Sequence, residues 1–81
     1  MKIPMEWLSG KTILTAAQVK KLDPGDHVWI HRCYGRRGEH VKVLAKVVQS
    51  GKKKMLQVRD YNGLPVLKEI RTAENIAYTA D

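Results

Sequence analysis

The stretch Leu22-Asp-Pro-Gly-Asp-His-Val-Trp-Ile-His-Arg32 decides the fold of this chain. Pro24-Gly25 favours a turn, because proline keeps the residue before it out of the helical region and glycine tolerates positive φ. The side chains then alternate, with Val28, Ile30 and Arg32 on one face. A period of two is typical of a β-strand. The sequence therefore predicts a turn that leads directly into a strand, followed by a loop rich in arginine and glycine.

Further strand signals follow this loop. Residues 40–49 alternate valine or alanine with lysine, which is typical of a half-buried antiparallel strand. Residues 55–60 and 64–71 show the same period, and a proline near the start of the second run indicates a sheet edge. Residues 72–75 suggest one helical turn, and residues 76–78 a last short strand. We therefore expect a mainly β fold.

Two local signals concern turns and helix ends. Asn62-Gly63 predicts a two-residue hairpin loop, because both residues tolerate positive φ. Thr15 and Gln18 have the spacing of a capping box at a helix start. We expect a short helix over residues 15–22, preceded by an irregular lead-in over residues 1–14 whose apolar side chains fold back onto the body.

The order of these elements resembles that of SH3-like small β-barrels, which include Tudor and KOW modules and the retroviral integrase C-terminal domain. The integrase pattern has a Pro-Gly-Asp turn before a Val-Trp-Ile-x-Arg strand, matched here by Pro24–Asp26 and Val28–Arg32, and a late asparagine-aliphatic step, matched by Asn75-Ile76. A Trp-x-Gly-Pro step is missing, and the first 21 residues have no counterpart. The resemblance implies one domain over residues 1–81, with an SH3-like barrel of four to five antiparallel strands over 26–78.

Composition narrows the class of protein. The chain has 81 residues and a formal net charge of +7, from 15 Lys and Arg against 8 Asp and Glu. A basic excess favours polyanionic partners, namely phosphate backbones, anionic lipid surfaces or acidic proteins. A single cysteine excludes an internal disulfide framework. No apolar run is long enough for a membrane span, and the start lacks a secretory signal. We expect a cytoplasmic protein, nuclear in a eukaryote; its size and charge suggest a phage or mobile-element accessory protein.

The candidate binding site is a set of basic side chains with one tyrosine near the predicted loops. Its members are Arg32, Tyr34, Arg36, Arg37, Lys42, Lys46, Lys52, Lys53 and Lys54. Arginine forks bond two phosphate oxygens, and tyrosine rings stack on bases. No recognition helix is present to read base edges in the major groove. The hypothesis is binding of DNA or RNA, largely without sequence specificity, through a cationic surface of loops and strand.

Other interpretations stay open. A protein-interaction module would hold an acidic or extended peptide in the barrel groove, and exposed Trp7 and Leu8 would favour it. A zinc site would draw its ligands from one set of side chains, and an aromatic cage from another. The zinc set is His27, His31, Cys33 and His40, and the cage set is Trp29, Tyr34, Tyr61 and Tyr78. We predict no enzyme, no metal and no cofactor, because nucleophile-base pairs, paired carboxylates and phosphate loops are missing. The sequence does not indicate an oligomeric state.

Overall fold

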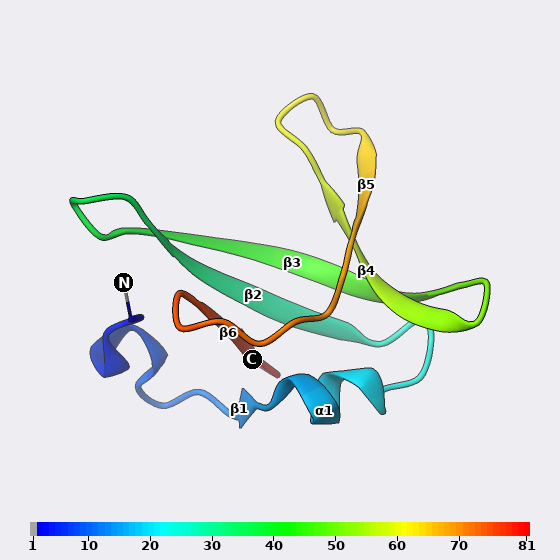
Figure 1. Cartoon of the computed structure of the whole chain (residues 1–81), viewed down its shortest axis with the longest axis horizontal. Helices are drawn as coiled ribbons and strands as arrows, with labels where there is room; N and C mark the ends of the chain where they lie inside the picture. The colour runs from blue at the N-terminus through cyan, green and yellow to red at the C-terminus, as the bar shows by residue number, and fades with distance from the viewer. Residues whose placement is uncertain (1) are drawn as a thin grey trace.

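The fold is built on one antiparallel sheet, seen in a computed structural model that describes residues 2–81. Within that range six strands lie in the order β1-β6-β2-β3-β4-β5 (Figure 1). The elements are η1 (Met5–Leu8), β1 (Ile13–Leu14), α1 (Ala16–Lys20), β2 (His27–Tyr34), β3 (Glu39–Ser50), β4 (Lys53–Arg59), β5 (Pro65–Lys68) and β6 (Ile76–Thr79). The predicted mainly β fold with a short N-terminal helix is confirmed, with six strands instead of four or five.

The strand that the sequence singles out lies in the middle of the sheet. β2 pairs along its whole length with β3, and its second half pairs with β6. Val28 and Ile30 lie on its inner face beside Ala45 and Val47 of β3 and Leu56 of β4, all buried. The apolar residues that alternate along β2 therefore face one continuous core, as expected for a strand with one buried face.

The short helix α1 covers one end of this core. Thr15 accepts a hydrogen bond from the Gln18 amide (3.1 Å), and the Gln18 side chain accepts one from the Thr15 amide (2.8 Å). The predicted capping box is therefore present. Val19 projects from the helix into the core and is fully buried. Five residues are too few for a stable isolated helix, so packing of Val19 and the cap must hold it in place.

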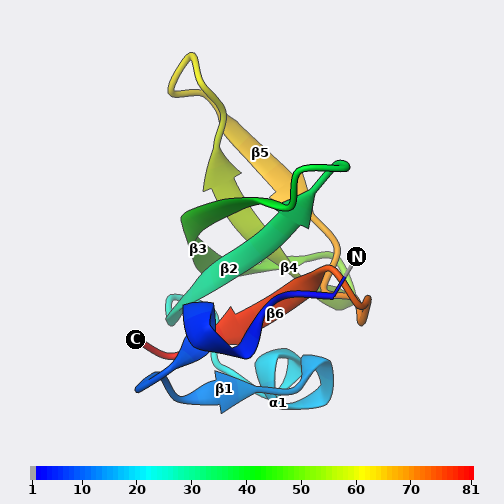
Figure 2. The same cartoon turned by 90° about the vertical axis from the view of Figure 1, so that its left-hand side faces the viewer.

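The N-terminal lead-in is more ordered than predicted. Residues 5–8 form a 3₁₀ turn, and Ile13–Leu14 form a strand that pairs with β6. Figure 2 shows this blue segment lying against β2 and β6. The ring of Trp7 stacks on His40, with centroids 4.3 Å apart, and Leu8 is buried. The secondary-structure propensity of residues 1–14 does not predict this ordered structure, because contacts with strands distant in the sequence create it.

Two predicted turns take another form. The loop after β4 has three residues, since the Asp60 amide donates to the Leu64 carbonyl and the Gly63 amide to the Asp60 carbonyl, each at 2.9 Å. Gly63 has φ +80°, and within residues 2–81 no residue other than glycine has positive φ. The result is a type I turn with a glycine bulge instead of a two-residue loop. Residues 72–75 form no helix; Ala73 and Ile76 are bridged across a tight turn.

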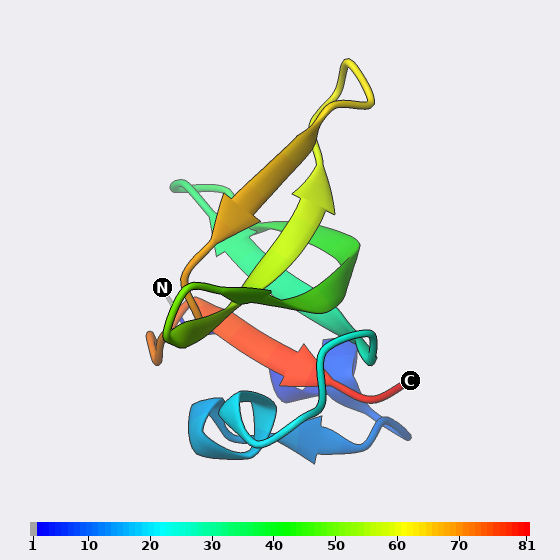
Figure 3. The ribbon, with the colours of Figure 1, turned by 90° about the vertical axis from the view of Figure 1, so that its right-hand side faces the viewer.

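The sheet curls around the core without closing. Figure 3 shows the β4–β5 hairpin rising away from β6 and α1. β5 begins at Pro65 and is an edge strand, as that residue predicted, and β1 is the other edge. In the described residues 2–81 the two edges do not pair with each other. The inner face is therefore left open between the β4–β5 hairpin and the end of β2. No helix in this range is long and apolar enough to cross a membrane.

Candidate functional site

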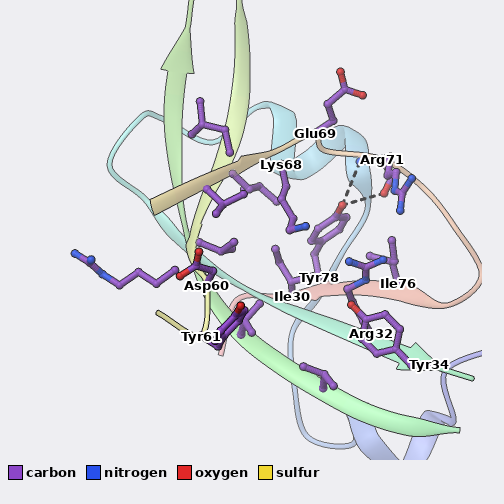
Figure 4. A pocket seen from close by; sticks show the side chains of 17 residues that line it. Ile30, Arg32, Tyr34, Asp60, Tyr61, Lys68, Glu69, Arg71, Ile76 and Tyr78 are labelled. Atoms are coloured by element: carbon purple, nitrogen blue, oxygen red, sulfur yellow. Dashed lines mark hydrogen bonds between the residues drawn. The ribbon is translucent and has the colours of Figure 1, made fainter. Parts of the chain in front are cut away.

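The open inner face forms a groove of about 820 Å³ between the β2–β3 and β4–β5 hairpins (Figure 4). Its floor is apolar, and its members come from four strands. They are Ile30 of β2, Val41 and Val43 of β3, Leu56 and Val58 of β4, and Ile76 and Tyr78 of β6. The volume falls within the roughly 300–1,000 Å³ typical of ligand sites. Both positively and negatively charged side chains line its sides.

Arg32 is a charged residue at an inward position of β2. It follows Val28 and Ile30 on the core face, and its cross-strand partners are Val41 and Ile76. The guanidinium carbon lies 4.9 Å from the centroid of the Tyr34 ring. The Nε atom is buried without a hydrogen-bond partner, and no acidic side chain within residues 2–81 forms an ion pair with it. Such a donor is costly unless water or a ligand supplies an acceptor.

Other cations join Arg32 around the groove, namely Arg59, Lys68 and Arg71. Lys68 points inward because it pairs with Leu56 in the antiparallel ladder of β4 and β5. Arg71 follows β5, and its backbone amide and carbonyl both bond to the Tyr78 hydroxyl, at 3.1 and 2.9 Å (Figure 4). That pair of bonds fixes the segment carrying Arg71 above the floor.

The two acidic side chains in the groove already have partners. Asp60 accepts hydrogen bonds from the backbone amides of Asn62 (2.8 Å) and Leu64 (2.9 Å). Glu69 forms an ion pair with Lys53 at 2.9 Å, and the hydrogen bond and charge of that ammonium lower the pKa of Glu69. Four cations against two engaged carboxylates leave the groove with a net charge of +2.

Two tyrosines stand at different ends of the groove. Tyr34 ends β2 and is 40% exposed, whereas Tyr61 at the tip of the β4–β5 hairpin is 97% exposed. Figure 4 shows their rings on separate sides of the floor. Tyr78 is buried between them and uses its hydroxyl on the Arg71 backbone. The exposed rings offer flat apolar faces to a ligand, and Tyr78 is part of the scaffold.

The nine residues predicted as one binding surface are divided between three regions. Arg32 and Tyr34 lie in the groove, and Arg36 and Arg37 are exposed in the β2–β3 loop directly beyond it. Lys42 and Lys46 lie on the opposite face of the sheet, since they pair with His31 and His27. The Lys52–Lys54 turn follows the far end of the 12-residue β3 (Figure 1). A straight strand of that length would measure roughly 37 Å, about as much as the 36 Å along the longest axis of the molecule.

The lysines of the far turn are partly engaged within the fold. Lys53 forms an ion pair with Glu69, and the Lys54 ammonium donates a hydrogen bond to the Leu22 carbonyl at 2.6 Å. Lys42 lies over the Trp29 ring on the outer face, 4.5 Å from its centroid. The structure therefore does not bring the predicted residues of the loops and of β3 together on one common cationic surface. Their lengths and faces keep the three groups apart.

Two of the histidines in the zinc hypothesis come together in a buried hydrogen-bonded chain. Thr79 donates its hydroxyl to the Asp81 carbonyl (3.1 Å), so it accepts from Nε2 of His31 (2.9 Å). Nδ1 of His31 is then left to accept from Nε2 of His40, at 3.0 Å. Burial, followed by the charges of His40, Lys42 and Lys11, lowers the pKa of His31 to about 4. No group of three possible metal ligands occurs within residues 2–81.

The aromatic cage is not assembled. Tyr34, Tyr61 and Tyr78 all line the groove, but Trp29 lies on the other face of β2, under Lys42. Trp7 and Leu8 do not stay exposed either; Trp7 is half-buried against His40, and Leu8 is buried. The feature that would favour a peptide-binding module is therefore absent at this end of the described chain.

Sequence reasoning missed Arg59, Lys68 and Arg71 as groove residues. The signal for Lys68 was available, because it stands two residues after Val66 and so shares its inward face. Arg71 lies outside any strand, and its position depends on the bonds to Tyr78. Arg32 carried the clearest signal, a charge in line with Val28 and Ile30.

Comparison of the chain with protein-family models, curated proteins and solved structures finds no match. The function is therefore inferred from the groove and its side chains.

Proposed function

We propose that this protein binds nucleic acid without strong sequence preference, through the inner-face groove and the adjoining β2–β3 loop. The observation that carries the proposal is Arg32, a cation on a core face with a buried Nε that has no partner. A phosphate or base oxygen would satisfy that donor and neutralise the charge. Arg71 and Lys68 beside it, and Arg36 and Arg37 beyond it, extend the cationic path.

The composition of the groove favours nucleic acid over an acidic peptide. An apolar floor with exposed tyrosines at its ends suits flat bases, and the surrounding cations suit the backbone that joins them. Lys42, Lys46 and the Lys52–Lys54 turn lie elsewhere, so we assign them a share in long-range attraction only. A net charge of +7 supports such attraction.

Binding is expected to depend steeply on salt. Four or five phosphate contacts on a single strand give a slope near −3 in log K against log salt, or roughly a 60-fold loss of affinity from 50 to 200 mM NaCl. Fluorescence anisotropy with labelled DNA and RNA oligonucleotides measures this slope. A slope near zero would contradict phosphate contacts and favour a peptide anchored by the apolar floor.

The site itself is tested with two variants that each remove one positive charge. Arg32→Gln is expected to weaken binding about tenfold, in line with loss of one charge-assisted contact of about 1.4 kcal/mol. Lys46→Ala, on the opposite face, is the matched control and is expected to change the affinity less than twofold. Equal effects of both variants would mean that net charge alone drives binding, and the groove would lose its role.

A further inference from the structure

The shape of the groove limits which form of nucleic acid fits it. Its cations stand within or beside a concave surface, between two projecting hairpins, and its floor is apolar. Resting on the nucleic-acid function proposed above, we propose that the groove takes unpaired bases of a single strand, and that a duplex does not fit. In a duplex the bases are stacked and paired inside, so the apolar floor would meet only sugar and phosphate.

The two exposed tyrosines supply stacking platforms for separate bases. Tyr34 stands at the end of β2 and Tyr61 on the opposite hairpin, with the floor between them (Figure 4). Arg32 lies against the Tyr34 ring, so its planar guanidinium enlarges that platform on the groove side. Single-strand binding proteins combine this kind of aromatic surface with a cationic groove.

Arg32 also sets how deep a ligand must reach. Its Nε is buried on the inner face between Val41 and Ile76, so an acceptor has to enter the groove to meet it. The backbone of a single strand is flexible enough to bring a phosphate or a base carbonyl to that depth. A duplex presents its phosphates on a stiff convex surface, and its persistence length of about 150 base pairs makes a local bend into the groove unfavourable.

The experiment compares two labelled probes at 150 mM NaCl, an oligothymidine of about 12 nucleotides and a duplex of the same length, chosen to match known site sizes. We expect the single strand to bind at least tenfold more tightly, although the duplex carries twice as many phosphates. Tyr34→Ala and Tyr61→Ala are each expected to weaken single-strand binding about tenfold and duplex binding less than twofold. Tyr61→Phe keeps the ring and is expected to retain the affinity. Both tyrosines are exposed, and circular dichroism confirms the fold of each variant.

The outcomes separate this inference from the function on which it rests. Equal affinity for both probes, or tyrosine variants that bind as the wild type does, would overturn the single-strand inference; a continuing loss in Arg32→Gln would then keep nucleic-acid binding. No binding of either probe at 50 mM NaCl would overturn both proposals. Tighter binding of polyglutamate than of the oligothymidine, compared at equal charge concentration, would also overturn them, in favour of an acidic peptide ligand.

Discussion

Acidification from pH 7 to pH 4 is expected to lower the free energy of unfolding by about 3 kcal/mol through His31 alone. The pKa of His31 is about 4 in the folded protein, against 6.5 in the unfolded chain. Below pH 6.5 the unfolded chain therefore binds a proton that the folded protein does not bind. Stability falls as the pH falls through this window, and the contribution levels off below about pH 4.

The physical reason lies in the geometry around the ring. His31 is 0% exposed, and both of its nitrogens are engaged, Nε2 with Thr79 and Nδ1 with His40. A proton on Nδ1 requires His40 to give up its donor hydrogen, and the new charge would face Lys42 and Lys11 in a buried site. His40 stacks on Trp7 near the N-terminus, and Thr79 lies in β6 near the C-terminus. Protonation of His31 would therefore first disturb the contacts of the two terminal segments.

The measurement is urea unfolding between pH 7 and pH 5, where most carboxyl groups remain ionised and about 2 kcal/mol of the loss is already expected. His31→Gln should remove most of this dependence, and His27→Gln, exposed at the start of the same strand, should keep it. An NMR titration of the imidazole follows the His31 pKa directly, even where a variant folds poorly. A midpoint near 6.5 for His31 would contradict its burial and the proposed hydrogen-bond chain.

The part of the fold that could be predicted from the sequence is the part set by local pattern. Alternation in β2 and β3, the capping box at Thr15 and the edge position of Pro65 each follow from a few neighbouring residues. Asn62-Gly63 indicated a hairpin correctly, but the two amide bonds to the Asp60 carboxylate favour a three-residue loop. The order of the first 14 residues depends on contacts with β2, β3 and β6, which no local pattern reveals.

The candidate site was predictable only residue by residue. Arg32 could be placed on the core face from its spacing to Ile30, and Tyr34 follows on the same face. The predicted basic residues could not be grouped correctly from the sequence, because local pattern does not fix the length of β3. This strand has 12 residues and separates Arg37 from Lys52. Arg71 is held at the groove by the hydrogen bonds of its backbone to the Tyr78 hydroxyl, seven positions along the chain. Neither the charge pattern nor the hydrophobic period of the sequence predicts such bonds.

Leu56→Ala is expected to lower the free energy of unfolding by about 3 kcal/mol, within the range of roughly 2–5 kcal/mol measured for buried leucines. Leu56 is the largest side chain that is fully buried, with 1% exposure, and it packs in the cluster with Val19 and Val47. A domain of 81 residues has a total stability of only about 4–12 kcal/mol. The variant is therefore expected to lose a quarter or more of the stability of the protein.

Leu67→Ala on the same β4–β5 hairpin is the matched control for this loss. Its side chain is 47% exposed, so the same substitution is expected to change stability by no more than about 0.5 kcal/mol. Leu56→Met, which nearly conserves volume, should cost less than about 1.5 kcal/mol. Urea denaturation of the three variants at pH 7 gives these differences directly.

The comparison of these variants also bears on the groove. Leu56 reaches the core and the groove floor at once, and its cross-strand partner is Lys68 on the groove wall. If the hairpin is anchored as described, Leu56→Ala weakens the fold and loosens the wall that carries Lys68 and Tyr61. A loss below about 1 kcal/mol would show that β4 is not packed on the core. The groove between the two hairpins would then lack a fixed wall, and the binding role of Arg32 would have to be sought on an open surface.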